Sequence, residues 1–140
     1  MEKILPPEII EFIFQFCGTI SQIRCLSINH WFYNNLRIVN LSRWRSEGFS
    51  KMALAKLSDK TILLYPQCQR LWVSENPNIT NLIGLANLTI LYAENDCGIN
   101  QNAILGLLRL TELNISGNSK ICDLNHLTTG RPPLTPLFVR

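Results

Sequence analysis

One spacing of apolar residues occurs three times between Cys68 and Leu127, and it constrains the fold more than any other feature of the chain. Each copy places apolar residues at offsets 0, 3, 5 and 11 and a polar residue at offset 8. The copies begin at Cys68, Leu88 and Leu110, which lie 20 and 22 residues apart. This period predicts stacked coils, because a single coil cannot bury its own apolar side. The matching residues are Cys68, Leu71, Val73, Asn76, Ile79, Leu82 and Leu85 in the first copy, Leu88, Leu91, Ala93, Asp96 and Ile99 in the second, and Leu110, Leu113, Ile115, Asn118, Ile121, Leu124 and Leu127 in the third.

The offsets also predict the local structure of each coil. Side chains at offsets 3 and 5 differ by two positions, so they point to one side of a short strand. The later offsets step by three, which suits a tight turn and a helical or 3₁₀ return segment. We therefore expect Leu71, Leu91 and Leu113 to be buried in the same layer of the stack.

The Asn at offset 8 is expected to close the bend after each strand. Its side-chain amide both donates and accepts, so it can pair with backbone groups of adjoining coils. Asp96 stands at this offset in the middle copy, and an ionised carboxylate cannot donate. The sequence predicts a weaker link there, or a small register change that lets Asn95 take the place of Asp96.

The three copies resemble the leucine-rich repeat, whose pattern is L-x-x-L-x-L-x-x-N-x-x-I-x-x-L. The resemblance implies an α/β protein whose repeats form a short leucine-rich-repeat solenoid. A fainter copy at Met52, Ala55, Leu57, Lys60 and Leu63 is interpreted as a degenerate first repeat.

A binding face is predicted from the residues that alternate with the core positions, since neighbouring strand residues point to opposite sides. Trp72, Tyr92 and Asn114 are expected to form the central column of this face. Adjacent Trp and Tyr side chains have the composition of a binding hot spot. Alternatively, the two rings stack only on each other and hold the coils together. The predicted target-binding residues are Arg70, Trp72, Ser74, Ile90, Tyr92, Glu94, Glu112, Asn114 and Ser116.

The N-terminal part of the chain is predicted to be helical. Residues 4–17 suit a helix with Pro7 in its first turn, residues 19–28 suit a second helix with Ser21 as its N-cap, and His30–Leu36 suits a third. Ile9, Ile13 and Phe16 share a face of the first helix, and further apolar residues lie off that face. Such a helix needs neighbours on two sides.

The segments L-P-x-E-I at Leu5–Ile9 and Asn29–Tyr33, with the later Trp44, resemble an F-box. An F-box followed by leucine-rich repeats is an architecture of substrate receptors of Skp–cullin–F-box ubiquitin ligases, and compact versions occur in large DNA viruses. The resemblance implies that residues 1–48, a three-helix module, bind a Skp-type adaptor while the repeats hold a protein target. The alternative is a binding scaffold whose helical N-terminus only caps the repeats and has no role with ubiquitin. The predicted adaptor-binding residues are Leu5, Pro6, Glu8, Ile9, Ile13 and Leu26.

The predicted organisation has four parts: the helical module at 1–48, a degenerate repeat or linker at 49–67, three repeats at 68–127, and a proline-rich tail at 128–140. A hydrophobic content of 46% with 16% charged residues indicates a packed protein. The net charge of +3, without a basic stripe, argues against nucleic-acid binding.

No arrangement of residues typical of a catalytic site, phosphate loop or metal site occurs, so we expect neither an enzyme nor a cofactor. The five cysteines include no C-x-x-C pair and are interpreted as free thiols in a reducing compartment. The sequence carries no signal-peptide core and no apolar run of membrane-spanning length. We therefore expect an intracellular protein that does not contact membranes.

Overall fold

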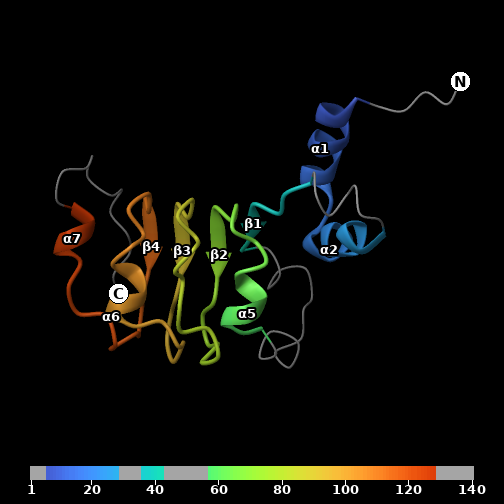
Figure 1. Cartoon of the computed structure of the whole chain (residues 1–140). Helices are drawn as coiled ribbons and strands as arrows, with labels where there is room; N and C mark the ends of the chain where they lie inside the picture. Colours follow the sequence, from blue (N-terminus) through green and yellow to red (C-terminus); the bar gives the residue numbers. More distant parts are fainter. Residues whose placement is uncertain (1–5, 29–35, 43–56, 129–140) are drawn as a thin grey trace, which may run out of the picture.

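The computed structural model describes residues 6–28, 36–42 and 57–128. A parallel sheet runs through these residues, and its strands stand side by side in sequence order (Figure 1). Two short helices lie in the connections, α5 (Asp59–Ile62) and α6 (Gln101–Ile104), and a third, α7 (Asn125–Thr128), follows the last strand. The strands are β1 (Asn40–Leu41), β2 (Arg70–Trp72), β3 (Ile90–Tyr92) and β4 (Glu112–Asn114). The chain is thus a mixed α/β protein with a small parallel sheet.

The strand register follows the sequence spacing. Leu71 pairs with Leu91, and Leu91 pairs with Leu113. All three side chains are buried, which confirms the prediction that they share one layer. Backbone hydrogen bonds continue the ladder beyond the strands, since the amide of Val73 donates to Tyr92 O at 2.8 Å.

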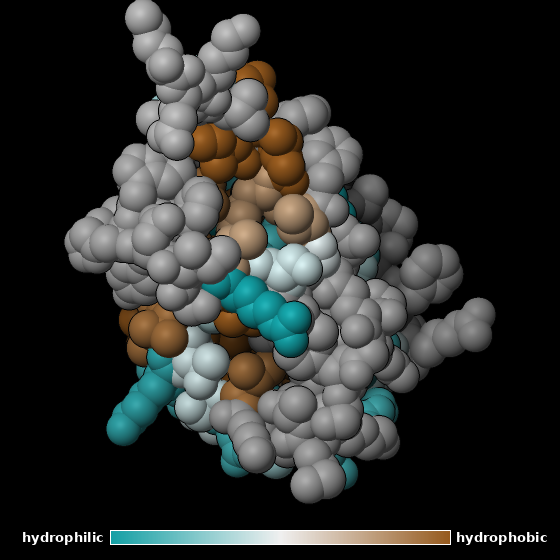
Figure 2. All heavy atoms as spheres, turned by 90° about the vertical axis from the view of Figure 1, so that its right-hand side faces the viewer, coloured by the Kyte–Doolittle hydropathy of each residue, from teal (hydrophilic) through white to brown (hydrophobic). Residues whose placement is uncertain are grey.

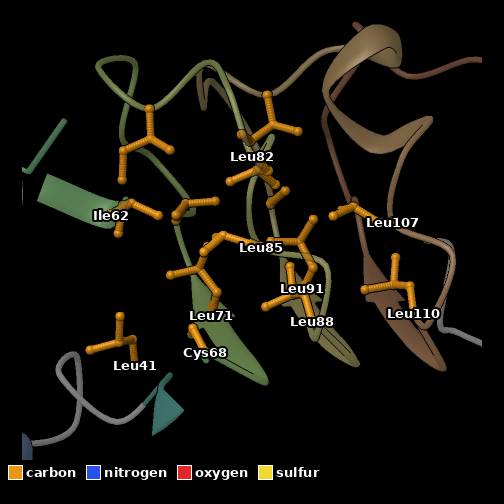
Figure 3. Packing of buried hydrophobic residues seen from close by; sticks show 14 of the residues in the cluster. Leu41, Ile62, Cys68, Leu71, Leu82, Leu85, Leu88, Leu91, Leu107 and Leu110 are labelled. Carbon is orange, nitrogen blue, oxygen red and sulfur yellow. The ribbon is translucent and has the colours of Figure 1, made fainter. Parts of the chain in front are cut away.

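The apolar core lies between the sheet and the connections (Figure 3). Equivalent residues of successive copies form its rows, and one such row consists of Cys68, Leu88 and Leu110. A second row, Ile62, Leu82 and Ile104, comes from the connections. Burying a leucine contributes about 1.5–3 kcal/mol, and these leucines are buried only because a neighbouring copy covers them.

The two extra residues of the second spacing lie between Ile99 and Ile104, where α6 forms. Asn100 caps this helix, because its side-chain oxygen accepts from the amides of Asn102 at 3.0 Å and Ala103 at 3.2 Å. The insertion is therefore absorbed in a connection, and the pairing of β3 with β4 keeps its register.

The predicted Asn residues after the strands are buried, at Asn76 and Asn118. In the middle copy neither Asp96 nor Asn95 takes this position, so the prediction that Asn95 takes the place of Asp96 is wrong. Both are exposed, and Cys97 is buried instead. Asn95 has a φ of 55°, but Glu75 and Gly117, the equivalent residues of the other copies, also have positive φ, so this conformation does not explain why Cys97 replaces Asp96 in the interior.

Two helices precede the sheet, α1 (Pro7–Phe16) and α2 (Thr19–Ile28). They confirm the two predicted helical segments, but Ser21 lies inside α2 and is not its N-cap. The helix begins at Thr19, and the amide of Gln22 already donates to Gly18 O. The predicted third helix lies outside the described residues, except for Leu36, which is buried and not helical.

Helix α1 is attached to the rest of the protein through one face. Phe14 is buried in the core, and the side-chain nitrogen of Gln22 donates to its carbonyl oxygen at 2.8 Å. The side-chain nitrogen of Gln15 donates to Arg37 O, also at 2.8 Å. These contacts connect α1 with α2 and with the segment that leads into β1.

Strand β1 was not predicted from the sequence. It pairs with β2 through Leu41 and Leu71 and supplies the buried residues Ile38 and Leu41. The strand next to β2 therefore comes from residues 40–41, within the range assigned to the helical module. The start of the degenerate copy, at Met52 and Ala55, lies outside the described residues, and Leu57 is not in a strand.

Candidate protein-binding surfaces

The outer side of the sheet carries the predicted aromatic column. Trp72 pairs with Tyr92, and Tyr92 pairs with Asn114, so the three residues are adjacent across β2, β3 and β4. Neighbouring strands lie about 4.8 Å apart, which places the side chains within contact distance. All three are half-buried, and Trp72 also packs against the core. The predicted column is confirmed.

Hydrogen bonds between strands fix the polar groups of this face. The Tyr92 hydroxyl donates to Glu112 Oε1 at 2.9 Å. The Asn114 side-chain nitrogen donates to Glu94 Oε1 at 2.6 Å. Because each bond joins two copies of the repeated pattern, the face is held in one conformation and needs little ordering before it contacts another molecule.

The prediction that Ser74 faces outward is wrong. Its side chain is 3% exposed, its hydroxyl donates to Glu94 Oε2 at 3.1 Å, and it accepts from the Glu94 amide at 3.0 Å. Ser74 lies beyond the end of β2 at Trp72, and its two hydrogen bonds with Glu94 of the next copy cover it. Ser74 positions Glu94 and is not itself available to a partner.

The other predicted target-binding residues lie around the column. Arg70 is exposed, and Ile90, Glu112 and Ser116 are half-buried. Arg70, Ile90 and Glu112 form the next row of paired residues. Burial raises the pKa of Tyr92, and so does its hydrogen bond to the negatively charged Glu112. The hydroxyl therefore remains a donor at neutral pH.

A second exposed surface lies on α1. Ile9 is 45% exposed and Ile13 is 50% exposed, one helical turn apart, and Pro6 and Glu8 beside them are also exposed. Seen from the end of the molecule that carries α1 and α2, hydrophobic atoms gather at the height of α1 (Figure 2). The first helix thus has apolar residues both in the core and in solvent, as its sequence predicts.

Two of the predicted adaptor-binding residues do not extend this surface. Leu26 is half-buried and packs against the core, so most of its side chain contacts the protein itself. Leu5 lies outside the described residues. Four of the six predicted residues, Pro6, Glu8, Ile9 and Ile13, are therefore together and exposed at the N-terminal part of the described chain.

No group of three or more His, Cys, Asp or Glu side chains within residues 6–28, 36–42 and 57–128 is arranged to hold a metal ion. None of the helices in the described part of the chain has the length and apolar character needed to cross a bilayer.

Together, the fold and these surfaces define a small α/β protein with a parallel sheet, one half-buried aromatic face and one exposed apolar helix face. No protein-family model matches the chain, and no curated protein matches it.

Proposed function

We propose that this chain is a protein-interaction adaptor, the substrate-recognition subunit of a Skp–cullin–F-box ubiquitin ligase. In this proposal the N-terminal helices form an F-box that binds a Skp-type adaptor, and the repeats form a leucine-rich-repeat solenoid that holds a protein target. Ubiquitin is transferred by a separate enzyme, so the chain needs no catalytic residue of its own. The proposed setting is intracellular.

The observation that carries the proposal is the exposure of Ile9 and Ile13 on a helix whose other face is buried through Phe14. A helix that only caps the core needs one apolar side, and its outer side is ordinarily polar. Two isoleucines at i and i+4 instead form a continuous apolar strip, which suits contact with a second protein. The resemblance of Leu5–Ile9 to an F-box supports a Skp-type adaptor as that protein.

The outer side of the sheet supports the second part of the proposal, the binding of a target. It combines two aromatic rings with the carboxylates of Glu94 and Glu112, which hydrogen bonds hold in place. Aromatic side chains commonly provide most of the binding energy of an interface, and carboxylates select oppositely charged groups. A target segment that presents Lys or Arg side chains beside apolar ones fits this face best.

Binding to a purified Skp-type adaptor, measured by calorimetry, tests the proposal. We expect the chain to bind, and we expect a variant with both Ile9→Glu and Ile13→Glu to lose at least about tenfold in affinity, because burying a carboxylate without a partner is unfavourable. The matched control is Ile83→Glu, which places the same charge on an exposed isoleucine of a connection and should leave adaptor binding unchanged.

The alternative scaffold makes a different prediction. If the adaptor does not bind the unmodified chain while the sheet face still captures a protein target, α1 and α2 only cap the repeats and the ubiquitin role is excluded.

A further inference from the structure

The connections between the strands expose large hydrophobic side chains that the proposed function does not use. Apart from Ile9 and Ile13 on α1, every large hydrophobic residue that the described part of the chain exposes lies in these connections. Ile83 is 76% exposed and Leu64 is 64% exposed, and the others are about half exposed. We call this set the return row: Leu63, Leu64, Ile83, Leu105 and Leu108.

The return row is aligned by the same spacing that aligns the core. Ile62, Leu82 and Ile104 are equivalent buried residues of successive connections, and the residue after each is Leu63, Ile83 or Leu105. The connections approach closely there, since a Cβ added to Gly84 would lie 3.2 Å from Leu63 Cδ2. Leu63, Ile83 and Leu105 are therefore equivalent positions on successive connections, and Leu64 and Leu108 lie one and three residues further along the first and the third of these connections.

The return row itself carries no formal charge. The stretches 61–69, 76–93 and 97–108 contain no Asp, Glu, Lys or Arg. Among the charged residues next to these stretches, Asp59 accepts from Thr80 and Asn81, Arg109 donates to Asn87 at 2.8 Å, and Lys60 is exposed. The five side chains can therefore meet an identical set without burying a charge.

We propose that the return row is the contact between two copies of this chain. The five residues together expose on the order of 500 Å², which lies within the ~300–600 Å² of the largest apolar patch on a typical monomer, a patch that is often functional. A stable interface buries ~800 Å² on each partner, so the row would supply its apolar centre. A two-fold axis across the row places the same residues of both copies opposite one another, as a symmetric dimer requires.

The proposal is independent of the proposed function, because the return row includes no residue of α1 or of the strands. Core side chains separate the connections from the sheet, so a dimer formed through the row leaves the aromatic column free in both copies (Figure 3).

Sedimentation equilibrium of the purified full chain, from micromolar to hundreds of micromolar, tests the proposal. We expect the average mass to rise with concentration from that of one chain towards twice that value. Ile83→Glu should raise the dimer dissociation constant about tenfold or more, because its carboxylate would face an apolar surface without a partner. Leu64→Glu, at a second strongly exposed position, should act in the same direction if Ile83→Glu does not fold.

The control is Ile13→Glu, which adds the same charge to an exposed isoleucine of α1 and should leave dimerisation unchanged. Circular dichroism establishes that each variant retains the fold. The proposal is overturned if the unmodified chain stays monomeric over the whole range, if a folded Ile83→Glu variant dimerises like the unmodified chain, or if Ile13→Glu weakens dimerisation equally.

Discussion

The side-chain nitrogen of Asn118 lies 3.2 Å from the sulfur of Cys97 and within hydrogen-bonding distance of two backbone carbonyl oxygens, those of Ala93 and Ile99. One amide of the third copy therefore joins three groups of the second copy in the interior. In the middle copy, the buried Cys97 thus takes part in the link between copies that the sequence predicts for a side chain at offset 8.

We expect Asn118→Asp to lower the free energy of unfolding by about 2–3 kcal/mol, because a carboxylate cannot donate to these acceptors and is costly to bury. Urea denaturation measures the loss. Asp96→Asn is the control, since Asp96 occupies the same offset in the middle copy but is exposed. A comparable loss in both variants would contradict the assignment of this link to Asn118.

Gly98 is expected to tolerate no side chain. A Cβ at this position would lie 2.5 Å from the carbonyl oxygen of Pro77 and would also collide with that of Ile79, and both oxygens belong to the backbone of the preceding copy. Gly98→Ala should cost about 1–3 kcal/mol of stability, as overpacking typically does. Gly106→Ala is the matched control, because a Cβ there meets nothing within 4 Å. Thermal unfolding of the two variants should differ clearly in midpoint.

Asp59 is expected to make stability depend on pH in the acid range. Burial alone would raise the pKa of its carboxyl, but hydrogen bonds from the Asn81 amide and from the Thr80 hydroxyl and amide outweigh burial and lower it. Because the folded-state pKa lies below the unfolded value of about 3.9, the stabilisation is complete above that pH and is lost as pH falls through the folded value.

Asp59→Asn should therefore cost about 1 kcal/mol at pH 7 and progressively less as the solution is acidified below pH ~4. Urea denaturation at a series of pH values measures this difference. If the difference in free energy of unfolding between the two proteins stayed constant down to acid pH, the charge of the Asp59 carboxylate would not be the source of the stabilisation.

The cysteines are expected to differ strongly in reactivity. Burial raises the pKa of the Cys68 thiol to about 12, whereas Cys122 is exposed. The thiolate is the reactive form, so alkylation of the folded protein by iodoacetamide should modify Cys122 first. The alkylation rate of Cys68 should be lower by a factor of roughly a hundred or more. Mass spectrometry of peptides follows each site. In urea, where the chain is unfolded, Cys68 and Cys122 should be alkylated at equal rates, which provides the reference. Equal rates in the folded state would contradict the burial of Cys68.

Variants of the aromatic column can distinguish a role of its rings in target binding from a role in holding the copies together. We expect the double variant Trp72→Ala with Tyr92→Ala to weaken capture of a protein target by about 2 kcal/mol or more, as loss of a hot spot does, while the thermal midpoint changes little. Tyr92→Phe is the control, because it keeps the ring and removes only the hydrogen bond to Glu112. A large fall in midpoint for the double variant would mean that the rings chiefly hold the copies together.

The repeated spacing was enough to predict the sheet register. Leu71, Leu91 and Leu113 pair as expected because every copy must bury the same positions against its neighbours. The aromatic column follows from the same rule. Strand β1 escaped prediction because its copy keeps only Ile38 and Leu41 at recognisable spacing, and two positions are too few to distinguish from chance.

Both errors about burial concern residues just after the strands, Ser74 and Asp96. Counting offsets placed Asp96 in the interior, but Asp96 is exposed and Cys97 is buried instead. The left-handed conformation of Asn95 does not explain this, because Glu75 and Gly117 also have positive φ and the residue after each, Asn76 or Asn118, is buried. Alternation predicted that Ser74 is exposed, but its hydrogen bonds with Glu94 of the next copy cover it.

The placement of α6 has a consequence for how relatives of this chain would vary. Two added residues between Ile99 and Ile104 change the length of one copy without moving any strand pair. Insertions and deletions should accordingly accumulate on the helical side, while the strand side accepts substitutions at constant length. Evolution can then alter the residues of the sheet face without changing the strand register, whereas changes in length fall on the side that carries the return row.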